Sequence, residues 1–78
     1  AMERSPGTVR ITFANENVSG VLGKVLSILA DNRVNVVDMV NKSRGELAFN
    51  LMDVESGPDA AVIEAIRGVA HVIRVRVI

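Results

Sequence analysis

The chain has 78 residues, of which 49% are hydrophobic, and its nine basic residues balance nine acidic ones. This length suits one domain, and the zero net charge provides no general attraction to nucleic acid or to an anionic membrane. The absence of cysteine excludes disulfides, thiolate metal sites and thiol catalysis. No apolar run approaches the roughly 20 residues of a membrane span, so we expect a soluble cytoplasmic protein.

The chain opens with residues that do not look like part of a domain. Ala1-Met2 resembles a vector remnant before a fragment boundary, and Ser5-Pro6-Gly7 is typical of a linker. We therefore expect residues 1–7 to precede a single domain at 8–78. Residues 8–14 alternate, with Val9, Ile11 and Phe13 on one face, which predicts a half-buried strand.

A strand-to-helix turn follows at residues 15–20, and a helix is expected from there to about Asn32. Its N-cap is predicted to be Asn17 or Ser19, and Gly20 allows backbone or a ligand to come close. The helix presents one apolar stripe to the core: Val21, Leu22, Val25, Ile28 and Leu29.

The second half of the chain repeats the strand and helix signals. Residues 34–40 predict a strand, and 41–45 predict a hairpin connection ending at Gly45. The next strand is expected to bury Leu47, Phe49 and Leu51, opposed by Ala48, Asn50 and Met52. A short helix is predicted to bury Val62, Ile63 and Ile66, with Pro58 in its first turn and Gly68 after its end. The last strand alternates Ile73, Val75 and Val77 with Arg74 and Arg76.

The element order is strand, helix, strand, strand, helix, strand. Two strand-helix-strand halves with right-handed crossovers interleave into an α+β, ferredoxin-like βαββαβ fold. This fold has a four-stranded antiparallel sheet with both helices on one face. The first and third strands are then central and the other two are edges, where another copy could pair.

Catalysis and metal binding are not indicated by the residues. The only histidine, His71, has no nucleophile near it in sequence, and the carboxylates are scattered. Asp38 and Asp53 lie within strands, where Lys42 or Arg44 could pair with them. We therefore predict no catalytic residue, no metal site and no cofactor in this domain.

RNA binding is a rival interpretation for this topology, because RNA-recognition modules stack bases on aromatic side chains of the central strands. Phe13 and Phe49 share faces with aliphatic residues, so both are expected in the core. Arg10, Arg74 and Arg76 could form a basic patch, but we interpret them as solubilising charges. No nucleic-acid partner is predicted.

The asparagine-rich turn has the strongest recognition chemistry in the chain. A helix N-terminus attracts a carboxylate, and the amide oxygens of Asn15, Asn17 or Asn35 could accept from an ammonium or hydroxyl group. Asn35 opens the second strand, an edge, so it could reach the turn of a neighbouring copy. The alternative is that Asn17 or Ser19 caps the helix and nothing binds.

Several stretches resemble one known family, the ACT domain. They are Asn17-Val18-Ser19-Gly20-Val21-Leu22, Val34-Asn35-Val36, residues 38–48 and the closing residues 72–77. The Asn-Lys-Ser-Arg-Gly-Glu hairpin is more narrowly similar to the C-terminal ACT domains of bacterial D-3-phosphoglycerate dehydrogenases, which use NAD in their catalytic part. The resemblance implies a regulatory domain without activity of its own.

The resemblance implies that, in that group, L-serine binds between two ACT domains joined through edge strands and inhibits serine biosynthesis by feedback. The matching side chains here are Asn15, Asn17 and Asn35, and Val21 and Leu22 match positions that offer backbone contacts. We therefore expect a homodimer with a small amino acid, L-serine, as its ligand.

Two positions depart from the family pattern. The family turn often has His where this chain has Asn15, which is shorter and cannot be a cation, and it often has Pro where this chain has Ser19. The loss of Pro leaves the turn less pre-organised. The alternative function is a structural oligomerisation module of the same enzyme that binds no ligand.

Overall fold

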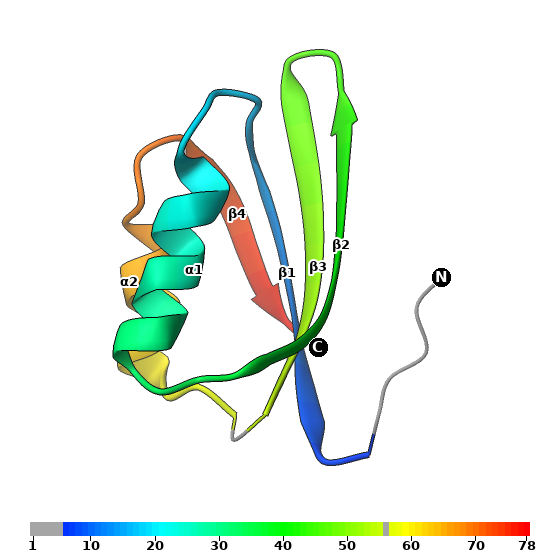
Figure 1. The fold of residues 1–78 in the computed structure, drawn as a ribbon. Helices are drawn as coiled ribbons and strands as arrows, with labels where there is room; N and C mark the ends of the chain where they lie inside the picture. The colour runs from blue at the N-terminus through cyan, green and yellow to red at the C-terminus, as the bar shows by residue number, and fades with distance from the viewer. Residues whose placement is uncertain (1–5, 56) are drawn as a thin grey trace.

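A computed structural model describes residues 6–55 and 57–78 of the chain (Figure 1). Of the predicted linker, residues 1–5 lie outside the described residues, and Pro6 and Gly7 form a turn before the first strand. The elements follow the predicted order: β1 (Thr8–Glu16), α1 (Val21–Asp31), β2 (Val36–Arg44), β3 (Leu47–Glu55), α2 (Ala60–Arg67) and β4 (Val72–Val77). No helix among the described residues is long and apolar enough to cross a membrane.

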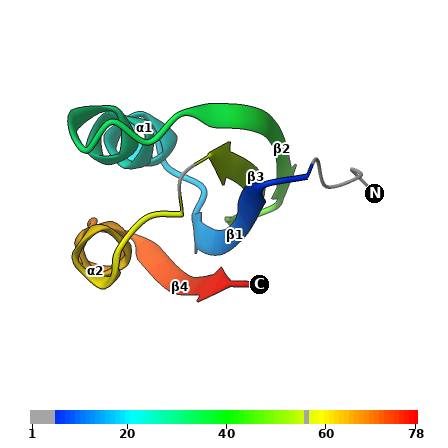
Figure 2. The same cartoon turned by 90° about the horizontal axis from the view of Figure 1, so that it is seen from below.

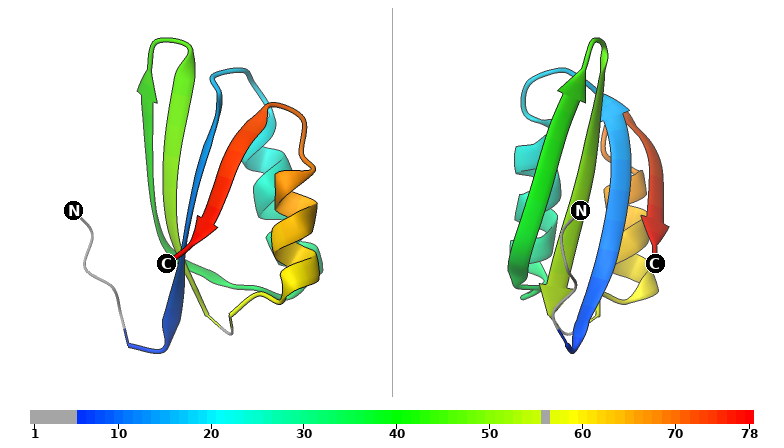
Figure 3. Two further views of the ribbon diagram at one scale, coloured as in Figure 1. Left: turned by 180° about the vertical axis from the view of Figure 1, so that it is seen from behind. Right: turned by 90° about the vertical axis from the view of Figure 1, so that its right-hand side faces the viewer.

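The four strands form one antiparallel sheet in the order β2-β3-β1-β4. Strands β1 and β3 are central and β2 and β4 are edges, as predicted. Both helices cover the same face of the sheet, which Figure 2 shows from below and the right panel of Figure 3 shows from the strand side. The predicted α+β, ferredoxin-like βαββαβ fold is therefore confirmed.

The core lies between the helix layer and the covered face of the sheet. Its members are aliphatic apart from Phe13 and Met52, and they confirm the predicted stripes of both helices and the inner face of the first strand. The buried core residues are Ile11, Phe13, Val25, Leu29, Val34, Met52, Val54, Val62, Ile63, Ile66 and Val75. Burial of each such side chain stabilises the fold by roughly 1.5–3 kcal/mol relative to its exposure.

The orientation of β3 is the reverse of the prediction. Ala48, Asn50 and Met52 are buried toward the helices, whereas Leu47 and Phe49 are on the open face, where Phe49 is 47% exposed. Both parities of this strand contain apolar residues, so alternation alone does not identify the covered one. The register decides it, because Met52 pairs with buried Ile11 and Asn50 pairs with buried Phe13.

The strand β2 begins later and ends later than predicted, and residues 41–44 belong to it rather than to a loop. Asn41, Lys42 and Ser43 are polar because the outer part of β2 is exposed on both faces. The β2–β3 hairpin extends past the ends of the helices (Figure 3). Its turn contains Gly45 at φ 62°, a conformation that glycine adopts without steric cost.

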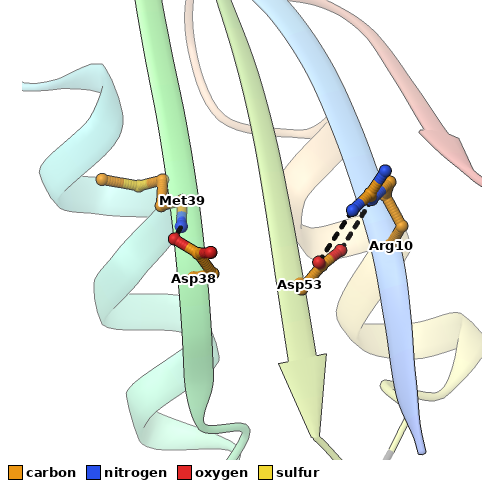
Figure 4. Close-up of polar contacts among 4 residues, drawn as sticks. All are labelled: Arg10, Asp38, Met39 and Asp53. Carbon is orange, nitrogen blue, oxygen red and sulfur yellow. Dashed lines mark hydrogen bonds and ion pairs between the residues drawn. The ribbon is translucent and has the colours of Figure 1, made fainter. Parts of the chain in front are cut away.

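A partly buried ion pair lies at the opposite end of the open face. Arg10 Nε and Nη2 donate to the two carboxylate oxygens of Asp53 at 2.8 and 2.9 Å, and the Asp53 side chain is 1% exposed (Figure 4). The hydrogen bonds to Asp53 raise the pKa of Arg10 above its ordinary value. The predicted pairing of Asp53 with Lys42 or Arg44 is wrong, because the register places Arg10 directly opposite Asp53.

Candidate functional site

Three chain connections meet at the start of α1. The Asn17 N–H donates to Glu46 O at 2.8 Å in the β2–β3 turn, and Asn17 Nδ2 donates to Gly45 O at 3.1 Å. The Glu16 N–H donates to His71 O at 2.9 Å in the α2–β4 connection. The turn is therefore held by backbone bonds to both neighbouring connections, which gives the helix start a fixed position relative to the hairpin.

The N-terminus of α1 has no side-chain cap. Gly20 is the N-cap at φ 90°, in the left-handed region, and no side chain among the described residues bonds to the helix start. The prediction that Asn17 or Ser19 caps the helix is therefore wrong. Its physical cause is that Gly20 occupies the cap position itself, while the Asn17 amide points to the hairpin.

The helix start remains open for an outside group. The first bond within the helix runs from the Lys24 N–H to Gly20 O, so the N–H groups of Val21, Leu22 and Gly23 precede it. The first turn contains no acidic residue, and both Gly20 and Gly23 lack side chains that would cover it. Such an end has the partial positive charge and the donors that an anion requires.

Asn15 lies at the end of β1 and is 5% exposed. Its Nδ2 donates to Glu16 O at 2.7 Å, and its Oδ1 accepts from Asn50 Nδ2 at 2.8 Å. Asn50 in turn accepts from Asn41 Nδ2, so three amides connect β2, β3 and β1 in a ladder on the covered face. The pairing of β1 with β4 also shifts between Ala14 and Asn15. Asn15 is thus held rigidly beneath the turn, and ligand contact by its side chain stays a prediction.

Asn17 is exposed and keeps an acceptor. Its Nδ2 is bonded to Gly45 O, whereas among the described residues no donor reaches its Oδ1. The two residues predicted to offer backbone contacts follow directly, with Val21 buried and Leu22 half-buried at the helix start. Asn17 thus belongs to the turn that leads into the helix start, and its amide is held against the hairpin.

Asn35 lies at the other end of the sheet. Its O accepts from the Glu55 N–H at 2.9 Å and its Nδ2 donates to Glu55 Oε2 at 3.3 Å, whereas the turn adjoins the start of β3 through Glu46. One copy of the chain therefore does not bring Asn35 together with Asn15 and Asn17. A site that includes all three requires Asn35 from a second copy.

Two residues of this region were not predicted to take part. Asn50 orients Asn15 from 35 positions away in the chain, and His71, at φ 75°, places its Nδ1 at 3.3 Å from Glu16 Oε1. The sequence signal for Asn50 is a polar residue within a largely apolar strand, and Asp53 of the same strand shares it. Residues 6–55 and 57–78 contain no group of three or more His, Asp or Glu side chains that could hold a metal ion.

The fold belongs to the ferredoxin-like α+β class. Within that class the chain belongs to the ACT family, because the family model for the ACT domain matches residues 9–71. ACT domains are regulatory domains that bind small ligands such as amino acids. A comparison with curated protein sequences finds no match.

Solved structures show the same fold at low sequence identity. The crystal structure of the ACT domain from the GTP pyrophosphokinase of Chlorobium tepidum has a TM-score of 0.77 and 14% identity, and the alignment covers 91% of this chain and 96% of that one. The solution structure of the same domain has a TM-score of 0.73 and 12% identity, over 91% and 84% of the two chains. GqqA, described as a novel type of quorum quenching acylase, has a TM-score of 0.69 and 23% identity, over 97% of this chain and 42% of its own.

Proposed function

We propose that this ACT domain senses a small amino acid, L-serine, and thereby regulates a D-3-phosphoglycerate dehydrogenase by feedback from serine biosynthesis. The domain itself is the binding module. In this proposal it has no catalytic residue and no cofactor, and the NAD site lies in the catalytic part of the parent enzyme. The ligand is held between two copies of the domain.

The observation that carries this proposal is the uncapped N-terminus of α1. The N–H groups of Val21, Leu22 and Gly23 suit the carboxylate of an amino acid, and Gly20 and Gly23 allow it to approach. The Oδ1 of Asn17 suits the ammonium group of the same ligand. A zwitterion matches both groups, whereas a simple anion or a simple cation matches only one.

The proposed homodimer is supported by the exposed outer edge of β2. Val37, Met39 and Val40 are each at least 36% exposed, and the strand has nine residues without a second neighbour in the sheet. Long edge strands with apolar side chains are prone to pair with another chain. Pairing of two copies along this edge is how the Asn35 of one copy would reach the turn of the other.

The choice of parent enzyme and ligand rests on the hairpin motif. Residues 41–46 resemble those of the dehydrogenase group, and in this structure Gly45 and Glu46 of that motif bond directly to Asn17. The solved structures named above are 14% identical or less for the ACT domain of the GTP pyrophosphokinase and 23% identical for GqqA, so their likeness concerns the fold.

A thermal melt with L-serine tests the proposal, with glycine and L-aspartate as controls. A ligand at a hundred times its dissociation constant stabilises the folded state by about 2.7 kcal/mol. For a domain of this size the midpoint then rises on the order of ten degrees. A rise with L-serine alone supports the proposal, and no rise with any of the three contradicts it.

A variant of Asn35 tests whether the ligand site is shared between two copies. Asn35→Ala should abolish the serine-dependent rise without altering the fold, because Asn35 is exposed and its bond to Glu55 is at the surface. Asn32→Ala is the matched control, since Asn32 is also exposed but donates to Ile28 O within its own helix end. The control should lower the midpoint slightly and keep the rise. An unchanged rise in Asn35→Ala would refute the shared site.

The second candidate function is assembly without a ligand. It is favoured by Asn15, whose amide is already bonded to Glu16 and Asn50 where the family often has His. A dimer that dissociates when β2 is altered, with no response to amino acids, is the result that this candidate predicts.

A further inference from the structure

The open face of the sheet contains a hollow of about 540 Å³ on the side opposite the helices. Its floor is formed by the small side chains of β1, Thr12 and Ala14, and larger side chains rise on both sides. The register places Leu51 of β3 beside Thr12 and Phe49 beside Ala14. We call this feature the open-face trough and define it by Thr12, Ala14, Phe49, Leu51, Arg74 and Arg76.

The two walls of the trough differ in chemistry. On the β3 side the wall is apolar, and Val40 of β2 extends it beside Leu51. On the β4 side Arg76 lies opposite Thr12 and Arg74 lies opposite Ala14. Lys42, opposite Phe49, adds a third cation at the far rim.

The charge of the trough is one-sided although the chain is neutral. Its lining and rim include three cations, Lys42, Arg74 and Arg76, and no acidic residue of the part of the chain that the structure describes. Among residues 6–55 and 57–78, no carboxylate pairs with Lys42, Arg74 or Arg76. Four acidic residues have the strand parity of this face, and none of them lines the trough. Asp53 is paired with Arg10, and the Asp38 carboxylate accepts from the Met39 N–H (Figure 4). Glu16 contacts His71, and Glu55 accepts from Asn35.

We propose that the open-face trough binds a small amphipathic anion, with its apolar body against Phe49 and Leu51 and its carboxylate or phosphate on Arg74 and Arg76. Arginine pairs are suited to the oxygens of such a group, because each guanidinium offers parallel donors. The volume lies within the roughly 300–1,000 Å³ of small-molecule sites.

The charges and side chains disfavour two other occupants. A second copy that met the same patch across a two-fold axis would bring six cations into one interface, and no acidic residue of the trough lining would pair with them. Single-stranded nucleic acid is bound on several stacking aromatics, whereas of the two phenylalanines at the trough only Phe49 is exposed and Phe13 is buried in the core. RNA binding was not expected because Phe49 was predicted to lie in the core. Phe49 is exposed, so an RNA oligonucleotide is included among the probes.

This site is separate from the α1 N-terminus. It is on the other face of the sheet, and it needs no contribution from Asn17, Asn35 or a second copy. Failure of serine sensing would therefore leave this proposal standing, and the reverse is also true.

The test is an amide-shift titration of the 78-residue chain with sodium decanoate below its micelle concentration. The amides of residues 12–14, 49–51 and 74–76 should shift together, and the cationic decyltrimethylammonium should not shift them. The double variant Arg74→Gln with Arg76→Gln should weaken the binding of decanoate by at least about tenfold, because hydrogen bonds to charged groups contribute that factor or more. Arg33→Gln, a cation at the end of α1, is the control and should bind like the parent chain.

Phe49→Ala is a second variant that keeps the fold, since the side chain is half exposed, and it should weaken decanoate too. Equal binding of the cationic and anionic probes, or binding unaffected by loss of both arginines, overturns the proposal. It is also overturned if a uridine-rich oligonucleotide shifts these amides and decanoate does not. A concentration-dependent dimer that Phe49→Ala dissociates, without decanoate binding, would assign the face to a second copy.

Discussion

The two helices of this domain begin in opposite ways. At α2, Asp59 is the N-cap and its Oδ1 accepts from the Val62 N–H at 3.0 Å. At α1, Gly20 is the N-cap and no side chain among the described residues bonds to the first turn. Both helices bury one apolar face, so the difference is not needed for packing. At α2 the chain itself supplies an acceptor for a first-turn N–H, whereas at α1 the first-turn N–H groups remain available to a ligand.

The largest expected effect comes from Gly20. Gly20→Ala forces a side chain into the left-handed region at φ 90°, which costs about 1–2 kcal/mol. The unfolding midpoint should fall by roughly 4–8 °C for each kcal/mol in a domain of this size. Gly20→Asn is the control, because Asn tolerates this region better, and it should lose less. Equal losses in the two variants would show that backbone strain is not the cause.

The next effect concerns the capped end. Asp59→Ala should cost about 1 kcal/mol, because the Val62 N–H loses its acceptor. Asp59→Asn keeps an oxygen at the same place and should retain most of the stability. Chemical denaturation measures both. The response to L-serine should not change in either variant, and a lost response would mean that the two helix ends are not independent.

The smallest effect compares an added acid at each helix start. Gly23→Glu should be more stable than Gly23→Gln by about 0.3–1 kcal/mol, because the carboxylate meets an unoccupied positive end. Ala61→Glu against Ala61→Gln should differ less, since Asp59 already occupies that end of α2. Gly23 has open space for a side chain, so the comparison is free of clashes within the domain. An equal gain in stability from Glu over Gln at both helix starts would contradict the claim that only the start of α1 is unoccupied.

The fold could be predicted because the order of periodic segments leaves few topologies. Which face of β3 is buried could not be predicted, because the strand has apolar residues on both faces. Only its pairing with β1 shows that Asn50 is buried and Phe49 exposed. The length of β2 was underestimated because polar residues such as Asn41 and Ser43 resemble a loop, although an exposed edge strand accepts them.

The candidate site was predictable only in part. The turn and its glycine follow from local sequence, and ligand contact by Asn17, Val21 and Leu22 stays a prediction. The cap was assigned wrongly because the competing partner of Asn17, Gly45 O, is 28 residues away in the chain. The bonds between Asn15 and Asn50 and between Arg10 and Asp53 depend on register in the same way. Contacts of this kind need the assembled sheet.

The most direct test of the account is an amide-shift titration with L-serine that compares the two helix starts. If the uncapped start of α1 binds the ligand, the amides of Val21, Leu22 and Gly23 shift most and saturate together with Asn17. The amides of residues 60–62, at the capped start of α2, should not move. Shifts of equal size at both helices, or none at α1, would contradict the claim that the uncapped end is the binding site.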